Sequence, residues 1–119
     1  MKSKIALAFD KCRKAKRPAL ITYTVAGDNT KNNSIKILKK ISKHADILEL
    51  GFPHNTPIAD GGQIQGSSHR ALKNGIKLKD VFQIVKEFKK TIPNKPIILM
   101  GYFNLIYQNG ENNFLNSCK

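Results

Sequence analysis

Two carboxylates, Glu49 and Asp60, occupy places where acidic side chains do chemistry more often than they pack in a core. Glu49 interrupts an apolar run, Ala45 to Phe52, that otherwise has the pattern of a buried strand. A carboxylate in such a run must face water, have a partner or take part in a reaction, because burying it alone is expensive. Asp60 follows in a loop rich in Gly, Pro and Asn. One acid on a rigid strand and one on a loop, at the same edge of a sheet, predict a proton-transfer site.

Each acid also has a purely structural interpretation. Glu49 could pair with a lysine at the end of its strand, and Asp60 could cap the helix that follows it. The loop from Gly51 to Gly62 is long for a connection between a strand and a helix, which favours a functional role. Its paired glycines, Gly61 and Gly62, would let the backbone close around a ligand, but they are equally compatible with an ordinary turn.

Three further polar residues are predicted at the same edge of the sheet. Tyr23 ends the first expected strand, and Tyr102 and Asn104 end the third. We expect the two tyrosines to contact a substrate. The three histidines have no metal-ligand spacing, and His54, in the loop, is expected to be solvated. The sequence has no phosphate-loop, dinucleotide or nucleophile-elbow motif.

The elements that position these residues follow from the spacing of apolar side chains. Helical spacing predicts five helices, with boundaries near Ser3–Ala15, Thr30–His44, Gln63–Lys73, Leu78–Lys90 and, weakly, Glu111–Ser117. Runs rich in β-branched and aromatic residues predict three strands, Ala19–Val25, Asp46–Leu50 and Ile97–Tyr102. Asn29 or Thr30 is expected to cap the second helix, and Asn74-Gly75 to end the third.

Strands that alternate with helices imply an α/β protein with a parallel sheet. Three parallel strands leave two open edges, and such sheets are usually larger and covered on both faces. We therefore predict that residues 1–119 are the N-terminal portion of a single TIM (β/α)₈ barrel domain. Ligands of such barrels bind at the carboxyl ends of the strands. Leu48 and Leu50 would then pack on helices, leaving Glu49 to face the barrel interior.

Composition limits the other classes of function. The net charge of +13 comes almost entirely from lysine, with only three arginines, and the lysines are spread over helix faces. That distribution favours a solvated surface over a nucleic-acid interface, which usually gathers arginine on one element. No apolar run is long enough to cross a membrane. The two cysteines, Cys12 and Cys118, suggest no disulfide framework, so a cytoplasmic protein is expected.

Several motifs resemble the tryptophan synthase alpha chain family. The resemblance runs through nearly the whole chain and is carried by segments in the family's order: Tyr23-Thr24-Val25-Ala26-Gly27-Asp28, Leu48-Glu49-Leu50-Gly51-Phe52-Pro53, Pro57-Ile58-Ala59-Asp60-Gly61, Ile64-Gln65, Arg70-Ala71-Leu72 and Pro96 to Asn104. The family has a TIM barrel of about twice this length. The resemblance therefore implies that this chain is the N-terminal portion of such a barrel.

The resemblance also implies a reaction, the retro-aldol cleavage of indole-3-glycerol phosphate to indole and glyceraldehyde 3-phosphate. Glu49 would be the proton-transfer residue, and Asp60 would bind the indole N–H and stabilise charge developing on the ring. The partner would be the beta chain of an α₂β₂ tetramer, which uses pyridoxal phosphate, whereas this chain would need no cofactor. The phosphate-binding strands of the barrel lie beyond these residues, so the 119-residue chain alone is expected to be inactive.

Two departures from the family pattern affect these expectations. Asn55-Thr56 replaces the usual Ser-Asp, whose Asp helps communication with the beta chain, and Gly62 replaces a usual Pro, which should loosen the loop. Another TIM-barrel lyase or isomerase acting on a phosphorylated metabolite remains the alternative. A non-enzymatic basic binding module is a further class, which strongly salt-dependent binding of nucleic acid would reveal.

Overall fold

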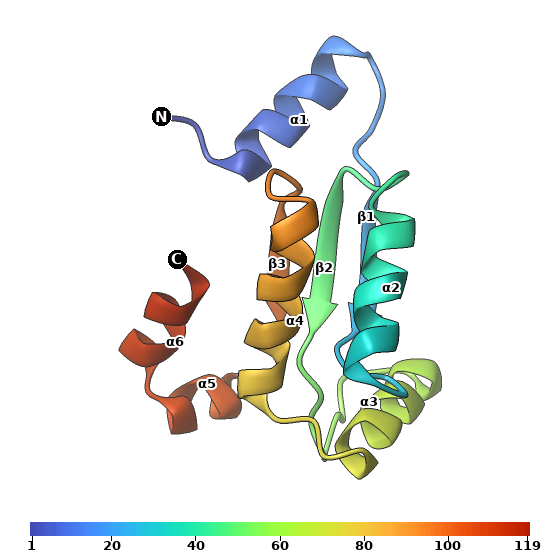
Figure 1. The fold of residues 1–119 in the computed structure, drawn as a ribbon, viewed down its shortest axis with the longest axis vertical. Helices are drawn as coiled ribbons and strands as arrows, with labels where there is room; N and C mark the ends of the chain where they lie inside the picture. Colours follow the sequence, from blue (N-terminus) through green and yellow to red (C-terminus); the bar gives the residue numbers. More distant parts are fainter.

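A computed structural model describes all 119 residues, in which parallel strands alternate with helices (Figure 1). In chain order the elements are α1 (Lys4–Lys14), β1 (Ile21–Val25), α2 (Lys31–Ile41), β2 (Ile47–Gly51), α3 (Gly62–Lys73), α4 (Leu78–Thr91), β3 (Ile97–Met100), α5 (Phe103–Asn109) and α6 (Glu111–Cys118). No helix is both long and apolar enough to cross a lipid bilayer.

The sheet has three parallel strands in the order β1-β2-β3, as the alternation of strands and helices predicts. The register places Tyr23 opposite Glu49, and Glu49 opposite Ile98. Paired residues of parallel strands share one face of the sheet, so these three side chains belong to the same face. All three strands therefore contribute to the surface that carries Glu49.

The hydrophobic core lies on the opposite face of the sheet. Leu48 and Leu50 are fully buried there, in a cluster with residues of α2 and α4 that includes Leu38, Val81, Ile84 and Phe88. Figure 1 shows α2 and α4 side by side over this face. The prediction that Leu48 and Leu50 pack on helices is thus confirmed, and the alternation along β2 turns Glu49 to the other face.

The face that carries Glu49 is only partly covered. Ile21 on β1 and Met100 on β3 share this face, and each is 42% exposed. Both outer edges of the sheet are also unpaired. A parallel sheet is stable when both of its faces are covered, so these features mark a surface that further strands and side chains of a barrel would fill.

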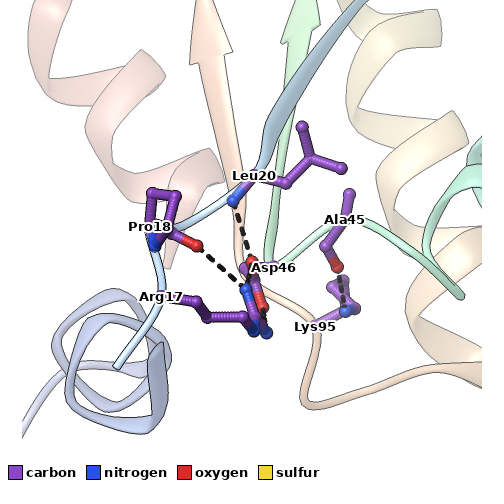
Figure 2. Close-up of polar contacts among 6 residues, drawn as sticks. All are labelled: Arg17, Pro18, Leu20, Ala45, Asp46 and Lys95. Atoms are coloured by element: carbon purple, nitrogen blue, oxygen red, sulfur yellow. Dashed lines mark hydrogen bonds and ion pairs between the residues drawn. The ribbon is translucent and has the colours of Figure 1, made fainter. Parts of the chain in front are cut away.

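An ion pair between Arg17 and Asp46 fixes the amino ends of the strands to the segment that follows α1 (Figure 2). Two nitrogens of the Arg17 guanidinium each donate to Asp46 at 2.8 Å, and the Leu20 N–H donates to the same carboxylate at 2.8 Å. These hydrogen bonds hold the pKa of Asp46 well below its usual range. The Lys95 ammonium donates to the Ala45 carbonyl beside them, which links the turn before β3 to β2.

The elements differ from the sequence prediction mainly after β3. The strand ends at Met100, two residues earlier than predicted, and the unpredicted helix α5 follows at Phe103. A Cβ at Gly101, the residue after the strand, would lie 2.0 Å from the Phe52 ring, so the chain passes close to that ring as it leaves β3. Asn104 consequently lies exposed in α5 rather than at the end of the strand, and its predicted place was wrong.

The predicted caps are confirmed where they can be compared. The Thr30 hydroxyl accepts the Asn33 N–H at 3.0 Å and caps α2, although that helix ends at Ile41 rather than His44. Asn74 ends α3, and Gly75 follows with a φ of 78°, the left-handed conformation that glycine adopts readily.

Candidate active site

Glu49 is positioned by the middle of the sheet. It is the third of the five residues of β2, it is half-buried, and both neighbouring strands flank it through Tyr23 and Ile98. Its carboxylate takes part in none of the six salt bridges of the molecule. The lysine-paired interpretation of Glu49 is therefore wrong, and the carboxylate is free to exchange a proton with a bound molecule.

Asp60 lies in the loop that leaves the carboxyl end of β2. A local turn precedes it, in which the Asp60 N–H donates to the Pro57 carbonyl at 3.1 Å, and the Gln65 side-chain amide donates to the Asp60 carbonyl at 2.8 Å. The next helix, α3, begins at Gly62 with Gly61 as its N-cap and no side-chain capping bond. Asp60 is therefore not the helix cap, and its carboxylate is available for another task.

Tyr102 contacts both the backbone and the side chain of this loop. Its hydroxyl accepts the Ala59 N–H at 2.9 Å and donates to Asp60 Oδ2 at 3.3 Å. Tyr102 is the second residue after β3 and the N-cap residue of α5, so it is held close to the end of the sheet. The structure thus brings Asp60 and Tyr102 together, as the sequence predicted.

Tyr23 lies in the middle of β1 rather than at its end, which corrects the predicted position. Its ring crosses to β2, where a Cβ on Gly51 would lie 2.0 Å from the Tyr23 hydroxyl oxygen. Burial raises the pKa of Tyr23 to about 12, with smaller contributions from the negative charges of Asp60 and Glu49. The Tyr23 hydroxyl lies beside Gly51, the last residue of β2, where the loop that carries Asp60 begins.

The sequence did not predict the contact that His54 makes in this region. It was expected to be solvated, but it is half-buried, and its ring lies 4.6 Å, centroid to centroid, from the Tyr102 ring at an interplanar angle of 33°. The two residues are far apart in the chain, so no local pattern could have indicated the contact. Its one sequence signal is its place directly after Phe52 and Pro53, which are both buried.

The space around these residues is open rather than enclosed. A cavity of about 210 Å³ beside Tyr23 lies between β1, α2 and α3 and is lined by residues that include Asp28, Gln63 and Ser67. Small-molecule sites generally measure roughly 300–1,000 Å³, so this cavity is smaller than most of them.

No group of three or more His, Cys, Asp or Glu side chains is arranged to hold a metal ion. The arrangement offers an unpaired strand carboxylate for proton transfer and a positioned loop carboxylate for binding a cationic or N–H group.

Comparison with known proteins decides the family. The model of the family described as tryptophan synthase alpha chain matches residues 9–119, almost the whole chain. The chain belongs to this family. It is 70% identical over 117 residues to the tryptophan synthase alpha chain of Pelagibacter ubique, an alignment that covers 98% of this chain and 44% of that relative. The corresponding chain of Pyrococcus furiosus is 48% identical over 101 residues.

Solved structures give the same result for the fold. The alpha subunit of tryptophan synthase from Legionella pneumophila superposes with a TM-score of 0.95 at 35% identity, over 98% of this chain and 45% of that one. A structure of the α₂β₂ complex of tryptophan synthase from Pyrococcus furiosus matches with a TM-score of 0.80 at 47% identity. The tryptophan synthase alpha chains are TIM barrels, and residues 1–119 have the fold of the N-terminal part of that barrel. The chain spans less than half the length of these relatives.

Proposed function

We propose that this chain forms the N-terminal portion of a tryptophan synthase alpha subunit, a lyase that cleaves indole-3-glycerol phosphate to indole and glyceraldehyde 3-phosphate. Membership of the family supports the reaction class. The observation that supports the proposal for the site is geometric: Glu49 faces Tyr23 on one side of the sheet, and Asp60, in the loop that follows β2, accepts a hydrogen bond from Tyr102 next to β3.

In the proposed reaction Glu49 transfers two protons in sequence. As the protonated acid it donates to C3 of the indole ring, which places a positive charge on the ring. As the carboxylate it then takes the proton from the side-chain hydroxyl while the carbon–carbon bond breaks, so that glyceraldehyde 3-phosphate leaves with a new carbonyl and the bonding electrons return to the ring. A half-buried carboxylate with no salt-bridge partner suits both steps, because no cation of the chain competes with the substrate for it.

Asp60 is proposed to bind the indole N–H and to stabilise the positive charge that develops on the ring. Such a carboxylate contributes to the rate only if it is held in place before the charge develops. Tyr102 donates a hydrogen bond to this carboxylate. The rings of Tyr23 and Tyr102 are proposed to contact the substrate.

The division of the barrel between this segment and the rest of the domain is part of the proposal. Residues 1–119 would supply both carboxylates, whereas the phosphate group of the substrate would be bound by later strands, as is frequent in TIM barrels. The second half of the barrel would also cover the face that now exposes Ile21 and Met100. We therefore propose that residues 1–119 are one portion of a single domain and have no activity alone.

The proposed partner is the tryptophan synthase beta chain in an α₂β₂ tetramer, because relatives with the same fold have been solved in such a complex. Asn55 and Thr56 are exposed in the loop before Asp60, at the positions where the family usually has Ser-Asp. Communication with the beta chain would then depend on different side chains here. A cytoplasmic location belongs to the same proposal, and the two free cysteines are compatible with it.

The test uses a joined chain, in which residues 1–119 are followed by the remainder of the Pelagibacter ubique alpha chain. We expect the purified joined chain to release indole from indole-3-glycerol phosphate. Glu49→Gln should abolish this release, since glutamine can neither donate nor accept the proton. Glu87→Gln is the matched control, because Glu87 lies on α4 with a side chain 40% exposed and pairs only with Lys90.

The result separates the proposed function from other barrel lyases and isomerases. A folded joined chain that released no indole would exclude the proposed activity. If Glu49→Gln kept full activity, the reaction would stand but the assignment of the proton-transfer residue would be wrong.

A further inference from the structure

His54 joins the first part of the loop to the framework of the sheet. Its ring lies against that of Tyr102, with centroids 4.6 Å apart and an angle of 33° between the planes. Tyr102 is the second residue after β3 and the N-cap of α5. The contact therefore connects residue 54, at the start of the loop, to a residue whose own backbone is set by the strand that precedes it.

The same tyrosine holds the last part of the loop through its hydroxyl. That oxygen accepts the Ala59 N–H at 2.9 Å and lies 3.3 Å from Asp60 Oδ2, to which it donates. The ring face of Tyr102 thus meets His54 while its hydroxyl meets Ala59 and Asp60. One side chain closes the loop at both of its ends.

The rest of the loop provides little that would fix the Asp60 carboxylate. The Ile58 N–H donates to the Thr56 carbonyl at 2.9 Å and the Asp60 N–H to the Pro57 carbonyl at 3.1 Å, and both are short-range turn bonds. Gln65 binds the Asp60 carbonyl, not its carboxylate. Gly61, which follows, has no atom within 4 Å of the position a Cβ would take. Tyr102 is the one side chain that donates a hydrogen bond to the carboxylate.

We propose that His54 is a positioning residue for Asp60. By stacking on Tyr102 it fixes the tilt of that ring, and the ring in turn fixes the hydroxyl that orients the loop carboxylate. The kinetic part of this inference rests on the proposed function, in which Asp60 acts on the substrate, whereas the structural part does not. A flat ring is the property that matters, so phenylalanine should replace His54 and alanine should not.

The structural part is tested by hydrogen exchange at the Ala59 amide in the joined chain. The amide is protected by the Tyr102 hydroxyl, so its exchange reports whether the loop is held. We expect exchange about tenfold faster in His54→Ala than in the parent, and within about twofold of the parent in His54→Phe. Equal protection in the parent and in His54→Ala would overturn the proposal whatever the activity of the joined chain.

The kinetic part is tested by indole release from the same three proteins. Because a misplaced catalytic group slows the chemical step, His54→Ala should lower kcat about tenfold and change KM less than about threefold. His54→Phe should restore kcat. In a chain that already carries Asp60→Asn, adding His54→Ala should have no further effect, since residues acting through one group are not additive.

The outcomes distinguish the two proposals. A joined chain with no activity but with the expected exchange at Ala59 would refute the proposed function and keep the loop contact. A kcat that fell equally in His54→Phe and His54→Ala, or fell a further tenfold on the Asp60→Asn background, would overturn the role of His54.

Discussion

Tyr23 lies directly opposite Glu49 across the β1–β2 pair, and its hydroxyl reaches over Gly51 on the same strand as Glu49. This relationship places a phenol beside a carboxylate that has no ion-pair partner. Burial and the charges of Asp60 and Glu49 together disfavour the phenolate. The tyrosine therefore stays neutral up to about pH 12 and can donate a hydrogen bond through its hydroxyl.

The raised pKa of Tyr23 predicts a loss of stability at high pH. The free tyrosine titrates near 10, and in the folded chain its pKa is about 12. Between these values the unfolded chain releases the proton and the folded chain keeps it, so the free energy of unfolding falls as the pH rises. Urea denaturation of the joined chain should show a steeper fall from about pH 9 to 11 than the Tyr23→Phe variant. If the free energy of unfolding fell with pH at the same rate in the two proteins, Tyr23 would not have a raised pKa in the folded chain.

Replacing Gly51 with alanine tests the close approach of Tyr23 to β2. The new Cβ would lie 2.0 Å from the tyrosine hydroxyl oxygen and 2.7 Å from Cζ, so the ring must move. We expect a loss of about 1–3 kcal/mol in the free energy of unfolding, typical of overpacking. Gly61→Ala is the control, since no atom lies within 4 Å of its Cβ position, and it should change stability by less than about 0.5 kcal/mol.

The sequence predicted the sheet because β2 and its neighbours carry strong local signals. The alternation of Leu48, Glu49 and Leu50 determined which side faces the helices, and the buried cluster confirms it. Thr30, Asn74 and Gly75 are residue types with a conformational reason to end or begin a helix. These features depend on residues that are neighbours in the sequence, so they can be predicted without knowledge of the fold.

The features that were missed depend on contacts between distant segments. The close approach of Gly101 to Phe52 and the contact of His54 with Tyr102 each join residues far apart in the chain. Asp60 could have been a helix cap by its position alone, and only the start of α3 at Gly62 excludes this. The nearness of Asp60 and Tyr102 was predictable because the parallel strands β2 and β3 end at one edge, but the hydrogen bond between them was not.

The ion pair at the amino ends of the strands predicts sensitivity to acid. Hydrogen bonds from Arg17 and from the Leu20 N–H depress the pKa of Asp46. A depressed carboxyl pKa stabilises the fold above the unfolded value, 3.8, and this contribution is lost as the pH falls through the folded value. Asp46→Asn should therefore lower the urea midpoint at pH 7 and flatten its dependence on pH below about 4.

Asp10→Asn is the comparison for the ion pair. Asp10 pairs with Lys2 and Arg13 on the surface of α1, and its side chain is 26% exposed, against 12% for Asp46. Surface ion pairs contribute little to stability. If Asp46→Asn and Asp10→Asn lowered the urea midpoint by the same amount, the Arg17–Asp46 pair would have no special role in joining α1 to the sheet.

The partly covered sheet face predicts how the 119-residue chain behaves alone. Ile21 and Met100 on the Glu49 face are each 42% exposed, and both sheet edges are unpaired. Exposed apolar surface of this kind binds hydrophobic dyes and promotes association. The isolated chain should therefore bind 8-anilinonaphthalene-1-sulfonate strongly, whereas the joined chain should not, because the added strands cover the face.

The same comparison measures how far the second half of the barrel completes the site. If the isolated chain is titrated with the separately expressed remainder of the Pelagibacter ubique relative, dye fluorescence should fall as indole release appears. Both changes should reach their midpoint at one concentration of the added part, since covering the Ile21 face and completing the proposed site are one event. Met100→Lys should weaken this association by placing a charge on the covered face, whereas Lys40→Met on α2 should not, because α2 packs on the opposite face of the sheet. Indole release by the isolated chain before any addition would show that the site needs no second half.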